Sequence, residues 1–93
     1  MKANVSTVNL ADGRVVTLSY GVAVAAFVPA DWPGFATGNF DQSAYRGFVK
    51  TDRAYSSTSN RHANLYARQN GSTARAIPHA VFRELVAPIA TEG

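Results

Sequence analysis

The sequence has no cysteine. Disulfide bridges, thiolate zinc sites and a cysteine nucleophile are therefore excluded together. The sequence also has no apolar run near the roughly 20 residues that a membrane-spanning helix needs, and its N-terminus lacks the hydrophobic segment of a signal peptide. We therefore expect a cytoplasmic protein that makes no contact with a membrane.

Acidic residues are few and lie far apart. The 93 residues include 6 Asp and Glu against 9 Lys and Arg, for a formal net charge of +3. The aspartates from Asp12 to Asp52 fall mostly in predicted turns, so the sequence offers neither a carboxylate pair for catalysis nor a set of metal ligands. We expect no metal and no cofactor.

Basic residues, by contrast, gather in the second half of the chain. Residues 42–83 carry a net charge of +6, and the remainder carries −3. The charged residues of this segment are Arg46, Lys50, Arg53, Arg61, Arg68, Arg75 and Arg83, with Asp52 as the one acid. This imbalance favours an anionic partner, either nucleic acid or the acidic face of a protein, through long-range attraction. Ordinary solvated surface charge is the alternative interpretation.

Length and composition predict one globular domain over residues 1–93, too short for a two-domain enzyme. Its first half favours strands. Asp12-Gly13 separates β-prone runs at 3–10 and 15–20, so we expect a hairpin closed by a type I′ turn with positive φ at both central residues. Residues 22–28 are apolar throughout, which is typical of a central strand covered on both faces.

Residues 29–43 interrupt the strand pattern with prolines, glycines and the aromatic residues Trp32, Phe35 and Phe40. A loop of this length inside a compact domain is either functional or poorly ordered. Its aromatic side chains either pack onto the core or present an apolar contact surface, and the sequence leaves both alternatives open. A further strand is expected over residues 45–50.

The second half of the chain predicts two helices. The first spans about residues 59–70, and the second spans about residues 78–86, with Pro78 in its first turn and one apolar face. The expected fold class is α+β. We predict a small, mostly antiparallel sheet of about four strands with both helices packed on one face.

The segment 55–62 reads Y-S-S-T-S-N-R-H and marks the start of the first helix. A Ser or Thr hydroxyl at this position can accept hydrogen bonds from the amides of the first turn. At 100° per residue, His62 falls on the apolar side of the helix, whereas Arg61 and Arg68 fall on the adjoining polar side. We therefore interpret His62 as a packing residue and the two arginines as candidates for binding phosphates or carboxylates.

This segment, preceded by the strand Y-G-V-A-V-A at 20–25, resembles a family of small bacteriophage proteins of unknown function. Members of that family open a helix with a Tyr-Ser-x-Thr-Thr-x-Arg-His type motif. The matching residues here are Tyr55, Ser56, Thr58, Arg61 and His62, and Ser59 replaces the second threonine. The resemblance covers about residues 10–85, and the loop 29–43 looks like an insertion. It implies a bacteriophage origin and no enzymatic activity, and it leaves the function open.

Small size, the basic segment and the lack of a catalytic motif favour a non-enzymatic binding protein. Together with the resemblance to the phage family, they lead us to expect a phage accessory protein that binds a host protein complex in the host cytoplasm. We expect it to inhibit a host defence system, in the manner of an anti-CRISPR protein, or another host process. The expected contact residues are Lys50, Arg53, Arg61, Arg68, Trp32 and Phe35. The residues expected to have structural roles are Tyr55, Ser56, Thr58 and His62.

Three alternatives remain open. The protein could bind nucleic acid directly through the same arginines, with Tyr45 or Trp32 stacking on exposed bases. A histidine-dependent nuclease would use His62 and His79 as general acid and base. Self-association through the aromatic loop would give a homo-oligomer.

Overall fold

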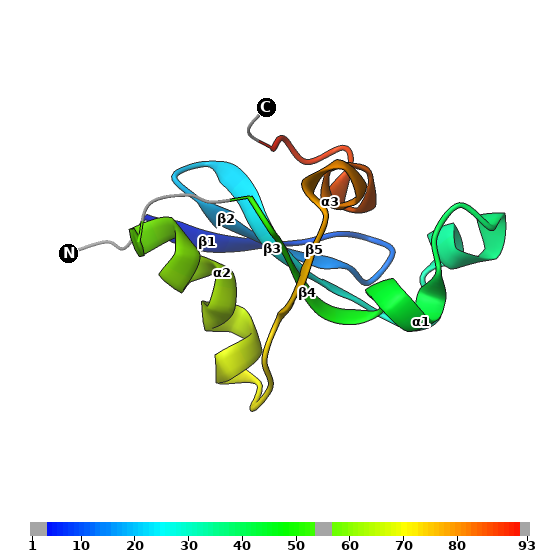
Figure 1. Ribbon diagram of the computed structural model, residues 1–93, viewed down its shortest axis with the longest axis horizontal. Helices are drawn as coiled ribbons and strands as arrows, with labels where there is room; N and C mark the ends of the chain where they lie inside the picture. Colours follow the sequence, from blue (N-terminus) through cyan, green and yellow to red (C-terminus); the bar gives the residue numbers. More distant parts are fainter. Residues whose placement is uncertain (1–3, 54–56, 92–93) are drawn as a thin grey trace.

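A five-stranded sheet runs through the computed structural model, which describes residues 4–53 and 57–91 (Figure 1). The strands are β1 (Val5–Asn9), β2 (Val15–Ser19), β3 (Val22–Val28), β4 (Gly47–Thr51) and β5 (Arg75–Ile77). They lie side by side in chain order, and each pair up to β4 is antiparallel. β5 pairs with β4 in parallel. The apolar run of β3 lies at the centre of the sheet, which confirms its prediction as a central strand.

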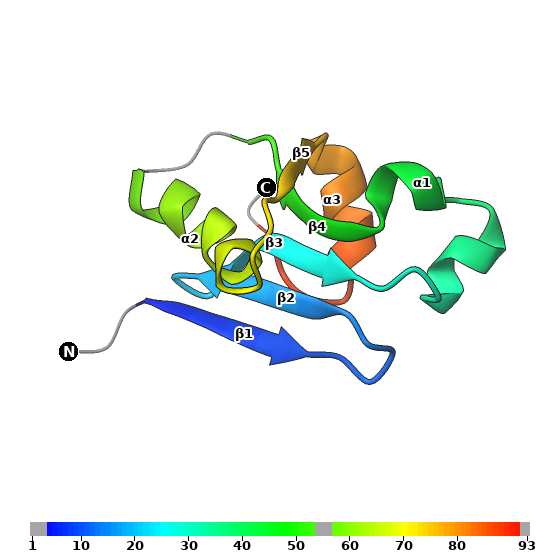
Figure 2. The same cartoon turned by 90° about the horizontal axis from the view of Figure 1, so that it is seen from below.

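The two longer helices cover opposite faces of the sheet (Figures 1 and 2). The helical elements are the short 3-10 helix η1 (Pro33–Thr37), α1 (Gln42–Tyr45), α2 (Ser57–Gln69) and α3 (His79–Val86). The α+β class is confirmed, but the expected placement of both helices on one face is wrong. α2 connects the parallel strands β4 and β5, and such a crossover must pass over one face of the sheet. α3 follows β5 and covers the other face.

Most of the apolar core lies between the sheet and α3. Phe82, Leu85 and Val86 of α3 are fully buried there. The strand residues of this cluster include Val16, Ala26, Val28 and Val49. On the other face, the buried apolar cluster beneath α2 is much smaller and consists of Val24, Ala25 and Ala63. The sheet therefore separates a large apolar layer from a thin one.

The turn of the first hairpin differs from the expectation. Gly13 has a φ of +97° and its amide donates to Leu10 O at 3.0 Å, but Asp12 does not have positive φ. The predicted type I′ turn is therefore wrong, and the geometry is that of a type I turn followed by a glycine in the left-handed region. The two-residue turn with positive φ at both positions is instead Tyr20-Gly21, at 52° and 85°, between β2 and β3.

The predicted boundaries of the other elements are close to the observed ones. α2 starts two residues before the expected 59–70 and ends one residue earlier, at Gln69. Gly71 has a φ of +72°, and Ser72 N donates to Ala67 O at 2.8 Å, as in a Schellman motif. The strand expected over 45–50 starts at residue 47, because α1 runs up to residue 45.

The aromatic loop 29–43 packs onto the core, which confirms one of the two alternatives for it. Trp32 is 8% exposed. Its ring centre lies 5.1 Å from that of Phe35, edge-on, and 5.4 Å from that of Phe40. Contact between aromatic rings at these distances adds to the free energy gained by burying them.

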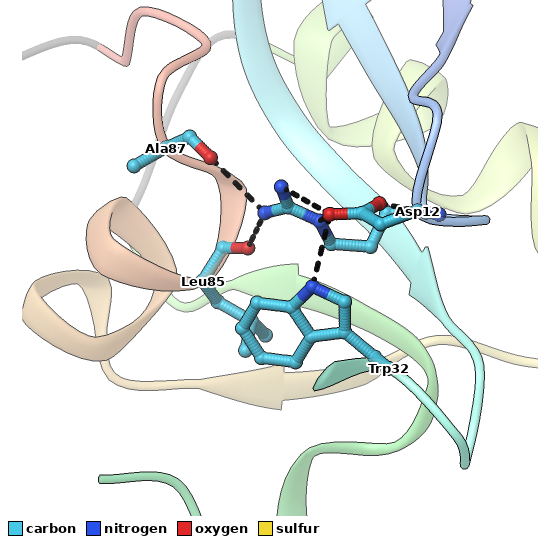
Figure 3. Close-up of polar contacts among 5 residues, drawn as sticks. Asp12, Trp32, Leu85 and Ala87 are labelled. Atoms are coloured by element: carbon cyan, nitrogen blue, oxygen red, sulfur yellow. Dashed lines mark hydrogen bonds and ion pairs between the residues drawn. The ribbon is translucent and has the colours of Figure 1, made fainter. Parts of the chain in front are cut away.

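A buried guanidinium joins three separate segments of the chain (Figure 3). Arg14 is 7% exposed, and its Nη1 donates to Leu85 O at 2.6 Å and to Ala87 O at 3.1 Å, at the end of α3. Its Nη2 lies 2.8 Å from Asp12 Oδ2 in an ion pair. Trp32 Nε1 donates to the same carboxylate oxygen at 3.1 Å, and the Arg14 guanidinium lies 4.9 Å from the Trp32 ring centre. The first hairpin, the aromatic loop and α3 are thereby connected through one charged pair.

These contacts explain why a charged side chain is stable at this position. The last carbonyl groups of a helix have no partner within the helix, and Arg14 donates to two of them. The carboxylate of Asp12 supplies the opposite charge, so neither charge is left unpaired away from water. Hydrogen bonds from the Arg14 side chain hold the pKa of the Asp12 carboxyl below its usual range.

We predict that Asp12→Asn lowers the free energy of unfolding at neutral pH by about 1–3 kcal/mol, because the charge-assisted hydrogen bonds are lost. Since the folded-state pKa of Asp12 is lowered, its contribution is complete above the usual carboxyl value and is lost as the pH falls through the folded-state value. Urea denaturation between neutral pH and pH of about 2 measures this. As the pH is lowered, the free energy of unfolding should decrease less for the variant than for the original protein.

The control for this prediction is Asp31→Asn, which removes an exposed carboxylate outside the network. It should leave the acid dependence unchanged. If the free energy of unfolding depended on pH equally in the original protein and in Asp12→Asn, the assigned role of the ion pair would be contradicted.

Among residues 4–53 and 57–91, one buried hydroxyl lacks a hydrogen-bond partner. Thr17 is 1% exposed, and its Oγ1 has no hydrogen bond to any described residue. An unpaired buried hydroxyl is unfavourable, so Thr17→Val should raise the free energy of unfolding by about 1 kcal/mol. Thr51→Val is the matched control, because Thr51 Oγ1 is hydrogen-bonded to His79 Nδ1 at 2.6 Å. Urea denaturation should show opposite signs for the two variants, and destabilisation by both would count against this account of Thr17.

Candidate functional site

The first residues of α2 lie on two faces of the helix, one buried and one exposed. His62 and Ser59 are buried against the sheet, whereas Thr58 and Arg61 are exposed. His62 thus lies on the packing side of the helix, as its position in the helical period predicts. The segment 54–56, with Tyr55 and Ser56 of the motif, lies outside the described residues.

The buried residues of the motif meet a serine from the sheet. Ser19 Oγ lies 2.8 Å from His62 Nδ1 and 3.0 Å from Ser59 Oγ. The ring of Tyr20 lies above this cluster, with its centre 6.1 Å from that of His62. A Ser-His contact is also the arrangement of an activated nucleophile and its base. Here, however, Ser19 is 0% exposed, so a substrate cannot reach its hydroxyl and the contact joins α2 to β2.

The two histidines do not form a pair. His62 faces the sheet from α2, whereas His79 lies at the start of α3 on the opposite face. His79 Nδ1 is hydrogen-bonded to Thr51 Oγ1, and its backbone amide donates to Asp52 Oδ1 at 3.0 Å. The general acid and base required by the nuclease hypothesis are therefore separated by the sheet.

The expected basic residues gather around α2. Lys50 extends from β4 toward the helix, and its Nζ donates to Asn64 Oδ1 at 3.1 Å. Lys50 and Arg53 also line a pocket of about 410 Å³ together with Asn60. Arg61 and Arg68 are exposed on the helix itself. The sequence therefore predicted a set of cations that the fold brings to one side of the molecule.

The two aromatic residues proposed as contact residues do not belong to this set. A contact residue must be exposed, but Trp32 is buried and its Nε1 donates a hydrogen bond to Asp12. Phe35 is partly buried and packs against Trp32. The sequence could not distinguish an aromatic loop that packs inward from one that stands out.

Ser19 is the residue of this region that the sequence analysis missed. The sequence places it only within the β-prone run at 15–20, without a partner. The available signal was its position two residues after Thr17 on the same face, followed by a turn, which brings it close to a helix packed there. Recognising it required knowledge of the face that α2 covers.

The described residues contain no group of three or more His, Cys, Asp or Glu side chains that could hold a metal ion. Within the same residues, every helix is too short or too polar to cross a membrane.

The sequence matches the model of a protein family over residues 1–84, and the chain belongs to this family. Its description is "Family of unknown function (DUF8033)". No match was found among curated proteins or among solved structures. Membership agrees with the expected resemblance to a family without a known function.

We predict that Ser19→Ala lowers the free energy of unfolding by about 1–3 kcal/mol, because it leaves His62 Nδ1 and Ser59 Oγ without this partner. Ser6→Ala is the matched control, since Ser6 is exposed on β1. Thermal and urea unfolding should separate the two variants. If they were equally stable, the cluster would not contribute to holding α2 on the sheet.

Proposed function

We propose that this protein is a non-enzymatic accessory protein of bacteriophage origin that binds an anionic macromolecule of the host, and that binding inhibits a host defence system or another host process. The observation that carries the proposal is the pair Arg61 and Arg68. Both are exposed on α2, and neither side chain has a hydrogen bond or an ion pair with any described residue. Two turns of helix place their Cα atoms about 10 Å apart on the same side.

The surroundings of this pair support the proposal. α2 contains no acidic residue to neutralise the arginines, and its sequence is STSNRHANLYARQ. Lys50 adds a further cation on the same side of the sheet. The helix sets the spacing of the two arginines in the folded protein, so less backbone entropy is lost when an anionic partner binds. The leading partner is an acidic protein surface.

The second candidate function is direct binding of nucleic acid. It is supported by a group of phenylalanine and arginine side chains at one end of the sheet, in a pocket whose lining does not include Arg61 or Arg68. Trp32, which the sequence suggested for base stacking, is buried, and these phenylalanines take its place in the hypothesis.

We predict that Arg61→Gln and Arg68→Gln each weaken recovery of the partner from a bacterial lysate by about 10-fold, because a hydrogen bond between charged groups contributes about 1.5–3 kcal/mol. Binding of the immobilised protein is compared at low and at high salt, before and after nuclease treatment. Loss at high salt indicates an ionic contact, and survival after nuclease treatment indicates a protein partner.

Arg83→Gln is the matched control, because it removes the same charge from an exposed position on α3, across the sheet from α2. It should bind as the original protein does. The proposal fails if the three variants bind equally well, or if expression of the original protein in bacteria changes neither growth nor resistance to phage.

A further inference from the structure

A second pocket opens at the end of the sheet where β3 ends and β4 begins. Its volume is about 390 Å³, within the range of about 300–1,000 Å³ that is typical of small-ligand sites. The side chains that matter here are Phe27, Phe48, Arg46, Arg75, Ser72 and Thr73. They combine aromatic rings, two cations and two hydroxyls, and no acidic side chain of the described residues lines the pocket.

The aromatic part of the pocket is held in place by the sheet. Phe27 and Phe48 are register partners on neighbouring strands, so their side chains lie on the same face. Their ring centres are 4.9 Å apart, and the ring of Tyr66 lies 5.8 Å from that of Phe48 on the side of α2. Both phenylalanines are only partly buried. A planar group that entered the pocket would find a fixed aromatic surface.

The cationic part is also prearranged. Arg75 Nη2 donates to Ala44 O at 2.9 Å and to Arg46 O at 2.6 Å, which fixes the direction of its guanidinium. Its remaining N–H groups and the whole Arg46 guanidinium have no hydrogen-bond partner among the described residues. Two arginines without acidic partners are suited to bind a phosphate group.

The hydroxyl side of the pocket follows α2 directly. Ser72 and Thr73 are exposed, and the turn after the helix positions them through the hydrogen bond from Ser72 N to Ala67 O. Their hydroxyls can donate to phosphate oxygens or to the edge of a base.

We propose that this pocket binds one nucleotide of a single-stranded nucleic acid, with the base against Phe27 and Phe48 and a phosphate at Arg46 and Arg75. The strand must be single, because the face of a base in a duplex is covered by its neighbours. An acidic peptide would use the arginines but not the aromatic pair. This inference rests on the second candidate function, and it names the site and the form of the nucleic acid.

The experiment is a fluorescence anisotropy titration with labelled oligonucleotides of about ten nucleotides, the size range of small single-strand sites. Oligothymidine, oligouridine and a duplex of mixed sequence are compared at low and at physiological salt. We expect both single strands to bind more tightly than the duplex. DNA and RNA share the proposed chemistry, so their relative affinity identifies the natural source.

Phe48→Leu should weaken single-strand binding by about 5- to 100-fold, because stacking of one base contributes about 1–3 kcal/mol. Phe35→Leu is the matched control, since it makes the same change in a partly buried ring outside the pocket. Arg46→Gln should weaken binding and reduce the slope of log affinity against log salt by about 0.7. Arg46 is exposed, so this variant tests the pocket even if Phe48→Leu fails to fold.

The outcomes separate this inference from the proposed function. Absence of single-strand binding, or binding that Phe48→Leu and Arg46→Gln leave unchanged, overturns the pocket assignment. Equal displacement of the oligonucleotide by polyglutamate also overturns it, because a general anion site would then suffice. If Arg61→Gln and Arg68→Gln have no effect while Phe48→Leu does, the pocket is supported and the α2 surface is not.

Discussion

The ion pair between Arg14 and Asp12 is the contact on which the arrangement of the remaining elements depends. Arg14 reaches from the start of β2 to the last carbonyls of α3, and Trp32 of the aromatic loop donates to the same carboxylate. α3 supplies Phe82 and Leu85, the largest fully buried side chains among the described residues. A charged group in the interior is unfavourable unless it is paired. Here the pair of Arg14 and Asp12 positions the end of α3 over the apolar core.

The sheet gives the molecule two unlike faces. The face under α3 is filled by bulky apolar side chains, and Arg14 donates a hydrogen bond to the end of α3. The face under α2 has little apolar packing and many polar contacts, such as those of Ser19 and Lys50. The exposed basic side chains of Arg61 and Arg68 lie on α2, and Lys50 lies on the same side of the sheet. The division follows from the alternation of side chains along each strand.

Local patterns in the sequence predicted much of the fold. The apolar run 22–28 indicated the central strand, and the helical period placed His62 against the sheet. These features depend on neighbours within one element. The opposite placement of α2 and α3 could not be predicted in the same way, because an apolar stripe shows that a helix is packed but not on which face of the sheet.

The features that the sequence did not predict depend on residues that are far apart along the chain. β5 has three residues, too few to show alternation, and its parallel pairing depends on the path of α2. Burial of Arg14 requires partners more than seventy residues along the chain. The pocket at Phe27 and Phe48 arises from strand register, which a sequence pattern leaves undetermined here. The binding roles of the α2 arginines stay predictions.

The small apolar cluster beneath α2 has a consequence for the dynamics of the protein. Val24, Ala25 and Ala63 bury much less apolar surface than the layer under α3, so less free energy is needed to detach α2 than to unfold the sheet. We infer that the backbone amides of α2 exchange with solvent through local opening, ahead of those of β3. The surface that carries Arg61 and Arg68 therefore belongs to a part of the fold that is less stable than the layer under α3. A partner that binds there also shifts the folding equilibrium of the helix.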